Sequence, residues 1–273
     1  MSGTKATSTQ RALAVLDCFS TDAPALTLSE LARRLDQPVS STHRQVGELT
    51  RWGALERDER GRYRIGLHLW EVGSLAPRSK GLREASLPFL EDLYEATHEN
   101  VQVAVLDNTE VLYVERIFGH HATRIIARPG ARLPLHATGV GQVLLAHSSM
   151  ELINDVLSAP LKRFTRHTMV NPEELRRELA SIRKAGYAIS DRQVELVSTS
   201  VAAPIRGSDN VVVAALSIII PSRGDSARRF VPAVLAAARG ISRALGAPVT
   251  HSTSPARAAG RTHSVPPHLP NSR

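Results

Sequence analysis

The sequence contains few of the residues that mark several protein classes. It has one cysteine, Cys18, and therefore cannot form an internal disulfide bond. Its longest apolar run, Val211 to Ile220, is far shorter than the roughly 20 residues that a membrane-spanning helix needs. The first residues, MSGTKATSTQRALAVL, lack the apolar segment and cleavage site of a signal peptide. We therefore expect a soluble, cytoplasmic protein with no membrane partner.

Aromatic residues make up only 4% of the chain, but 42% of its residues are hydrophobic, which excludes a wholly disordered protein. The 273 residues allow two domains of moderate size. The net charge of +8 is unevenly distributed, because residues 249–273 contain three arginines and no acidic residue. That segment is rich in Pro, Ser, Ala and His, so we expect a disordered basic tail there and a flexible start over residues 1–8. Net charge alone therefore does not establish a nucleic-acid partner.

The N-terminal third has the pattern of three helices. Apolar residues at helical spacing predict a first helix from about Thr9 to Phe19. The segment Thr27–Glu30 forms a capping box that opens a second helix, and Pro38 ends it. A third helix is expected from about Ser40 to Trp52, with Gly53 as its stop. Two short helices joined by a three-residue turn have helix-turn-helix spacing.

The exposed start of this third helix carries short polar side chains and one arginine, in the run Ser40-Ser-Thr-His-Arg-Gln45. Such side chains suit phosphates and base edges in a DNA major groove, and no acidic residue occurs before Glu48. An ordinary amphipathic helix remains the alternative for this stretch alone. Residues 55–65 follow as a hairpin with Arg60, Arg62 and Arg64 near its tip, as in the wing of a winged helix.

The rest of the chain predicts an α+β domain with an antiparallel sheet covered by helices. Pro77 interrupts the helical pattern, which places a linker at residues 74–84 between a DNA-binding domain at 9–73 and a sensor domain at 85–248. We expect strands at 101–106, 111–117, 124–127, 188–190, 198–205 and 211–220. We expect helices at 67–75, 83–97, 139–147, 149–157, 172–185 and 226–245.

One stretch of the sensor domain is suited to binding an anion. Thr138 is a good N-cap, and the glycines of Gly139-Val-Gly141 allow a ligand to approach the first amides of the helix. A helix N-terminus with free amides can bind a carboxylate. The alternative is a closely packed helix start without a ligand.

Several stretches resemble the IclR family of bacterial transcriptional regulators over about residues 10–246. They are RALAVLDCF, TLSELARRLDQPVSSTHRQVGEL, RWGALERDERGRYRIGLHLWEVG, the LPLHATG stretch that ends at Gly139, and the segment from Gly186 to Ile205. The resemblance implies a winged helix-turn-helix and a GAF/profilin-like effector-binding domain, in a homodimer or homotetramer that binds a double-stranded DNA operator. It implies DNA contacts from Arg11, Thr27, Ser40, Ser41, Thr42, His43, Arg44, Gln45, Arg60, Arg62 and Arg64. It implies effector contacts from His136, Thr138, Gly139, Val140, Ser190, Asp191, Ser200 and Ser217.

The chain departs from the family pattern at Gln45 and Gly47 in the DNA-binding half, and at Ser190, Gln193 and Val197 in the sensor. The resemblance therefore implies a less acidic pocket than in some relatives, suited to an anionic or polar neutral ligand. The spacing is most similar to the branch that senses acids of aromatic catabolism. Operator affinity is expected to change when a small organic acid, a carboxylate or aromatic acid, binds.

Other chemistries have little support in the sequence. The histidines His120, His121 and His136 lack metal-ligand spacing, no nucleophile motif or phosphate-binding loop occurs, and Glu173 and Glu174 are typical of a helix start. We therefore expect no metal, no cofactor and no enzyme activity. A winged helix that serves as a protein-interaction platform beside a metabolite sensor is the main alternative, and an enzyme with an accessory DNA-binding end is a distant one.

Overall fold

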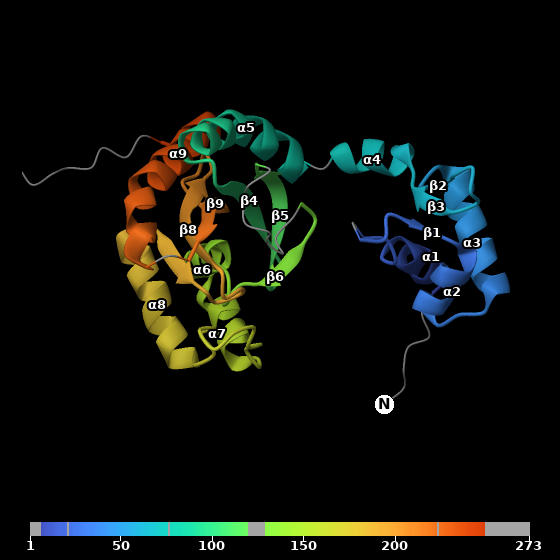
Figure 1. The fold of residues 1–273 in the computed structure, drawn as a ribbon, viewed down its shortest axis with the longest axis horizontal. Coiled ribbons are helices and arrows are strands. Elements are labelled where there is room, and N and C mark those ends of the chain that lie inside the picture. Colours follow the sequence, from blue (N-terminus) through green and yellow to red (C-terminus); the bar gives the residue numbers. More distant parts are fainter. Residues whose placement is uncertain (1–6, 21, 76, 120–128, 223, 249–273) are drawn as a thin grey trace, which may run out of the picture.

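The computed structural model describes residues 7–20, 22–75, 77–119, 129–222 and 224–248. The strand expected at 124–127, the pair His120-His121, the tail at 249–273 and most of the N-terminal segment 1–8 lie outside the described residues. The N-terminal part contains α1 (Ser8–Leu16), β1 (Ala25–Leu26), α2 (Leu28–Leu35), α3 (Val39–Trp52), β2 (Leu55–Arg57), β3 (Tyr63–Ile65) and α4 (Leu67–Ser74) (Figure 1).

Local sequence signals set the ends of these helices. Thr7 and Thr27 each form a capping box, with Gln10 and Glu30 respectively, at the starts of α1 and α2. Asp36 adopts a left-handed backbone conformation and ends α2. The chain then turns through residues 36–38 into α3. This is the helix-turn-helix that the sequence predicts.

A small core and a three-stranded sheet complete the winged helix. The strands lie in the order β1-β3-β2 and are antiparallel, so the short β1 adds a third strand to the expected hairpin. The cluster of buried residues joins all three helices to the sheet and consists of Val15, Leu26, Leu31, Val46, Leu55 and Tyr63. This packing fixes the orientation of α3 relative to the wing formed by β2 and β3.

The C-terminal part is built on a six-stranded antiparallel sheet in the order β6-β5-β4-β9-β8-β7. Its strands are β4 (Asn100–Asp107), β5 (Glu110–Ile117), β6 (Arg132–Pro134), β7 (Ala188–Asp191), β8 (Ser198–Arg206) and β9 (Val212–Pro221). Its helices are α5 (Pro77–Thr97), α6 (Gly139–Ala146), α7 (Met150–Ser158), α8 (Pro172–Ala185), the 3-10 helix η1 (Gly224–Phe230) and α9 (Val231–Ala244). The predicted α+β class is confirmed.

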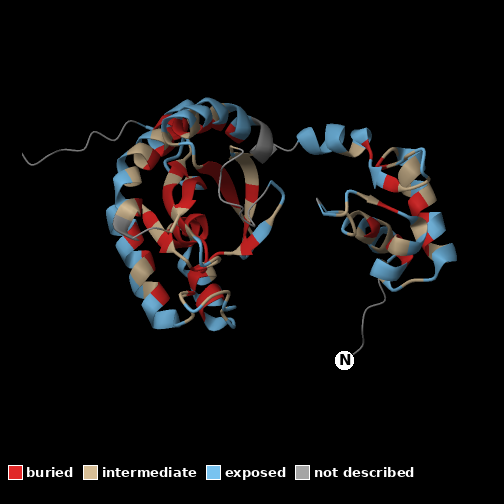
Figure 2. Cartoon of the chain, viewed as in Figure 1, coloured by how far each residue is buried: buried red, intermediate tan, exposed pale blue. Residues whose placement is uncertain are grey.

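Helices cover both faces of this sheet, so its central strands are buried on both sides (Figures 1 and 2). On one face, α5 and α9 pack over alternate strand residues such as Val103, Ala203 and Leu216. On the other face, α6 and α8 pack over the intervening residues, among them Ala202 and Ala215. This alternation follows from the two-residue repeat of a strand.

Three helix boundaries differ from the expected ones, since α1 ends at Leu16 rather than near Phe19. Helix α5 begins at Pro77 rather than near Arg83, because proline needs no amide partner in a first helical turn and suits a helix start. The last helix is divided, since Gly224–Phe230 forms a 3-10 helix before α9 begins. No helix among the described residues is long and apolar enough to cross a membrane.

Candidate DNA interface and effector cavity

The start of α3 presents a polar surface of the kind expected for DNA contact. Ser40, His43 and Arg44 are exposed and Ser41 is partly exposed. The first turn of α3 contains no acidic residue. These four side chains lie where the sequence predicts them, on the outer face of the second helix of the helix-turn-helix.

Two residues predicted to contact DNA instead hold α3 in place. Thr42 is fully buried and its hydroxyl donates to the carbonyl of Pro38 at 3.2 Å. Gln45 is 5% exposed and its amide donates to Gln37 Oε1 at 3.1 Å. Both are one helical turn before the inward-facing Val46 and Leu49, so the helical period already places them on the buried face. Thr42 and Gln45 therefore lie on the buried face of α3, and their contact with DNA stays a prediction that this burial does not support.

Acidic neighbours pair with part of the wing's positive charge. Arg62 forms an ion pair with Asp58 at 3.0 Å, and Arg64 pairs with Glu56 at 2.9 Å. Two hydrogen bonds lower the pKa of Glu56, the larger effect coming from the backbone amide of Leu67 and the smaller one from the side chain of Arg64. Arg60 is exposed at the turn between the strands, with its backbone amide bonded to Asp58.

The two remaining predicted DNA contacts lie near helix starts. Arg11, in the second turn of α1, is partly exposed, and its Nε atom donates to the carbonyl of Thr7 at 3.4 Å. Thr27 is exposed, and its hydroxyl accepts from the amide of Glu30 at 3.3 Å while it caps α2. Both positions are compatible with a nearby phosphate, because helix N-termini favour anions.

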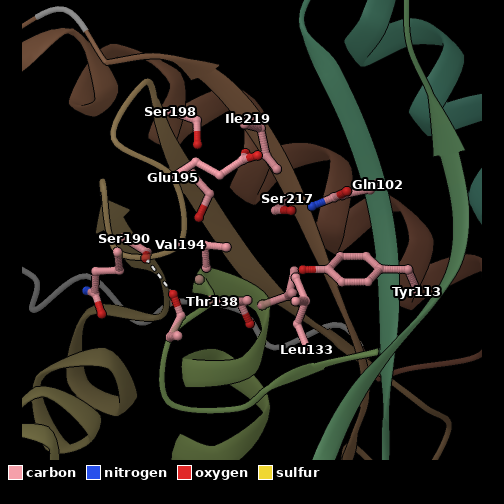
Figure 3. Close-up of a pocket in the computed structure, with 15 residues that line it drawn as sticks. Gln102, Tyr113, Leu133, Thr138, Ser190, Val194, Glu195, Ser198, Ser217 and Ile219 are labelled. Carbon is pink, nitrogen blue, oxygen red and sulfur yellow. Dashed lines mark hydrogen bonds between the residues drawn. The ribbon is translucent and has the colours of Figure 1, made fainter. Parts of the chain in front are cut away.

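The sensor domain contains a small cavity of about 40 Å³ between the sheet and the start of α6 (Figure 3). Six of the eight predicted effector contacts line it, namely Thr138, Gly139, Val140, Ser190, Ser200 and Ser217. The sequence therefore brings these distant segments to one site, through α6 and strands β7, β8 and β9.

The start of α6 forms one wall of the cavity. Thr138 caps the helix by accepting a hydrogen bond from the amide of Gly141 at 3.0 Å. The amides of Gly139 and Val140 are not donors in the hydrogen bonds found between described residues. Amides at the positive end of the helix dipole are suited to a carboxylate.

Gly139 also lets α6 approach the sheet closely. A Cβ atom at this position would overlap Ser200 Oγ on β8. The glycine thus serves packing between α6 and β8, as in the alternative drawn from the sequence. Its role in ligand access stays a prediction.

Two predicted effector contacts do not line the cavity. His136 is buried, and its Nε2 atom lies 2.9 Å from the carbonyl of Lys162, while burial lowers the pKa of its imidazole. Asp191 follows Ser190 on β7, so its side chain points to the opposite side of the sheet. There it accepts hydrogen bonds from Thr199 and Ser222. His136 and Asp191 therefore lie outside the cavity wall, and their contact with the effector stays a prediction that this placement does not support.

Sequence reasoning missed much of the cavity wall. The loop after β7 lies against the cavity wall, and two hydrogen bonds to Gln193 fix its position. The hydroxyl of Thr168 donates to the carbonyl of Gln193 at 2.6 Å, and the side-chain amide of Gln142 on α6 donates to Gln193 Oε1 at 3.2 Å. Gln193 lies in the family-like segment from Gly186 to Ile205, but nothing in that segment assigns it an effector contact, because these residues become neighbours only in the folded sheet. The missed residues are Gln102, Tyr113, Leu133, Ala137, Gln193, Val194, Glu195, Ser198 and Ile219.

The hydroxyl of Tyr113 and the carboxylate of Glu195 give the cavity polar groups besides the serines. Burial raises the pKa of Tyr113, a hydrogen bond with Thr138 acts against that rise, and the charge of Glu195 adds to it. Tyr113 is therefore a neutral hydroxyl at physiological pH. Within the described part of the chain, no three His, Cys, Asp or Glu side chains form a group that could hold a metal ion.

A winged helix-turn-helix, together with a helix-covered sheet that encloses a polar cavity, defines the class of ligand-binding transcriptional regulators. Two family models match this chain: the helix-turn-helix domain of IclR over residues 8–59, and the C-terminal domain of the bacterial transcriptional regulator IclR over residues 76–243. The chain belongs to the IclR family of bacterial transcriptional regulators. The resemblance identified from the sequence is confirmed.

Known relatives agree with this assignment over most of their length. The chain is 32% identical to the regulator XynR of Escherichia coli, covering 88% of this chain and 98% of XynR. It is 33% identical to the E. coli repressor IclR, covering 86% and 89% respectively. An IclR homolog from Microbacterium hydrocarbonoxydans, crystallised with 4-hydroxybenzoate, is 39% identical with a TM-score of 0.84, covering 88% of this chain and 99% of that one. XynR and IclR are both named as transcriptional regulators.

Proposed function

We propose that this regulator binds its operator through the start of α3 and the wing, and that a small organic carboxylate in the sensor cavity changes its operator affinity. The cavity at the N-terminus of α6 is the observation on which the proposal rests. An aromatic acid is the favoured class, since the similar Microbacterium homolog was crystallised with 4-hydroxybenzoate. The effector acts by binding one arrangement of the protein better than another, with a coupling of about 1–3 kcal/mol.

On the DNA side, the proposal assigns base and phosphate contacts to the exposed side chains of α3. Ser40, Ser41 and His43 have short side chains that reach a groove wall, and Arg44 can donate two hydrogen bonds to a guanine. In the wing, Arg60 lies at the exposed turn and is assigned to the phosphate backbone. Arg11, Thr27, Arg62 and Arg64 are assigned to backbone contacts, the last two exchanging their carboxylate partners for phosphates.

The assembly assigned to this function is a homodimer or homotetramer in the cytoplasm, on an operator with two half-sites. Two recognition helices related by two-fold symmetry contact half-sites about one DNA turn, ~34 Å, apart. A palindromic or nearly palindromic operator follows from that symmetry.

The first test is fluorescence anisotropy with DNA from upstream of the protein's own gene, against scrambled DNA, at two salt concentrations. The proposal requires a preference for the native sequence at the higher salt concentration, because phosphate contacts alone weaken steeply with salt. Addition of 4-hydroxybenzoate is expected to shift the binding curve. Equal binding to both DNAs that disappears at higher salt would argue against sequence-specific regulation of that promoter.

A matched pair of arginine variants locates the interface. Arg44→Ala is expected to weaken specific binding by about 1–3 kcal/mol if Arg44 contacts a guanine, with a smaller effect on scrambled DNA. Arg51→Ala serves as the control, because Arg51 is exposed in the last turn of α3, away from its N-terminal half. An equal effect of the two substitutions would place the interface elsewhere.

A further inference from the structure

Strand β7 is the last strand on one side of the six-stranded sheet, so among the described residues its outer edge has no neighbouring strand. The amide of Arg192 donates to the carbonyl of Ser198, just before β8 pairs with β7, at 3.0 Å. Hydrogen-bonded positions alternate along an antiparallel pair, so the backbone groups of Ser190 face β8, whereas those of Ile189 and Asp191 face outward. No hydrogen bond found within the described chain uses these outward amides and carbonyls.

A groove of about 700 Å³ runs along this open edge. Its walls come from β7, α8 and η1, and they include the apolar side chains of Ile182, Ala185, Ile189 and Ala227. An extended segment can add to a sheet at such a place, because the edge supplies main-chain hydrogen bonds and the groove holds side chains. The β7 edge of a second copy carries its own α8 and η1. A single extended segment therefore fits this groove better than the edge of a second copy.

The described chain ends beside the start of this edge. Ala247 and Pro248 line a second groove together with Gly186, which lies two residues before β7 begins. Strands β9 and β7 are both antiparallel to β8 and so run in the same direction. Helix α9 follows β9 and returns the chain to the end of the sheet at which β7 starts, as in a unit of two parallel strands joined by a helix. The next segment of the chain is therefore placed to run along β7.

The residues that follow Pro248 have the composition of a short strand. They read Val249-Thr-His-Ser-Thr-Ser254, with β-branched side chains at three of these six positions, and prolines at 248 and 255 bound them. In extended form they span ~20 Å, which exceeds the ~13 Å of the four-residue β7. The three arginines of the segment 249–273 all lie beyond them.

We propose that residues 249–254 add to the free edge of β7 as a further, parallel strand. Their backbone bonds to the outward groups of Ile189 and Asp191, and their side chains enter the groove between α8 and η1. Ser190, between those two residues, lines the effector cavity, so the added strand supports one wall of the cavity from outside. The remaining residues, 255–273, keep the composition of a disordered basic tail.

The test is amide hydrogen exchange of the full chain, read by mass spectrometry with fragmentation to single residues. The double substitution Thr250→Pro and Thr253→Pro removes two amide donors from the added strand, because proline cannot continue a sheet ladder. It is expected to speed exchange at the amides of Ile189 and Asp191 by about tenfold or more, since they lose their hydrogen-bond partners.

A matched control has the same two prolines at the same spacing. Ala256→Pro with Ala259→Pro lies beyond Pro255 and is expected to keep the wild-type exchange rates at β7. Arg132 on β6, at the opposite edge of the sheet, is expected to exchange alike in all three proteins.

Three results would overturn the proposal. Fast exchange at Ile189 and Asp191 in the wild-type protein would leave the edge uncovered. Slow exchange that neither proline pair changes would show that residues 249–254 are not the cover, and its loss on dilution would assign the edge to a second copy. An equal gain in exchange from both proline pairs would show that the added strand does not lie at residues 249–254.

Discussion

Replacing Gly139 with alanine tests how closely α6 must approach the sheet. A Cβ atom there would overlap Ser200 Oγ, whereas its next neighbours, Ala202 Cβ at 3.4 Å and Ser200 Cβ at 3.5 Å, are at ordinary contact distance. The strain therefore comes from a single hydroxyl oxygen. Relieving it requires α6 and β8 to separate or the serine to change rotamer, and overpacking of this kind costs about 1–3 kcal/mol.

The same geometry predicts that a second substitution removes the cost. Ser200→Ala deletes the overlapping oxygen and leaves only ordinary contacts around the new methyl group. Gly139 does not have a positive φ, so alanine fits its backbone and restricts the unfolded chain, which contributes about 0.4–1 kcal/mol of stability. Gly139→Ala is therefore expected to be neutral or stabilising in the Ser200→Ala background.

The assay is urea denaturation of the wild type, both single variants and the double variant, followed by far-UV circular dichroism. Tryptophan fluorescence provides an internal control, because Trp52 and Trp70 lie in α3 and α4 and report on the N-terminal half. The expected coupling energy between the two substitutions is about 1–3 kcal/mol. An equal cost of Gly139→Ala in both backgrounds would refute the assigned overlap.

Three further predictions concern other parts of the chain. Gly141→Ala should destabilise the sensor more than Gly139→Ala, because its Cβ would overlap the backbone carbonyl of Leu135, which no side-chain change can remove; calorimetric melting checks this. Thr27→Ala removes the cap of α2 and should cost about 1 kcal/mol, seen as an earlier fluorescence transition in urea; an unchanged midpoint would contradict the cap's contribution. For Asp191, burial raises the pKa, but hydrogen bonds from three side chains outweigh it and lower the pKa below 3.8. This contribution to stability is present above pH 3.8 and disappears as the pH falls through the folded-state pKa of Asp191. The melting temperature of Asp191→Asn should therefore be lower than that of the wild type at pH 7, and the difference between the two should disappear below about pH 3.8.

Local sequence signals determined most of the secondary structure. The capping boxes at Thr7 and Thr27 fix helix starts within three residues, because a side chain and an amide nearby in sequence satisfy each other. Thr138 and the glycines after it marked the start of α6 in the same way. At Thr42 and Gln45, the helical period is the signal in the sequence that indicates burial.

Only the tertiary structure decided which residues share the cavity. Val103 pairs with Glu115 but Ala104 pairs with Tyr113, so a bulge in β5 shifts the register between the two strands. No residue type in this segment predicts that bulge. Gln102 meets Ser217 because β4 pairs with β9, which lies more than a hundred residues later in the chain. Strand pairing of this kind depends on the packing of whole faces against helices, which no single segment encodes. The sequence alone thus determined the helix starts and the turn at Thr138 before α6, whereas the wall opposite that turn follows from long-range pairing in the folded sheet.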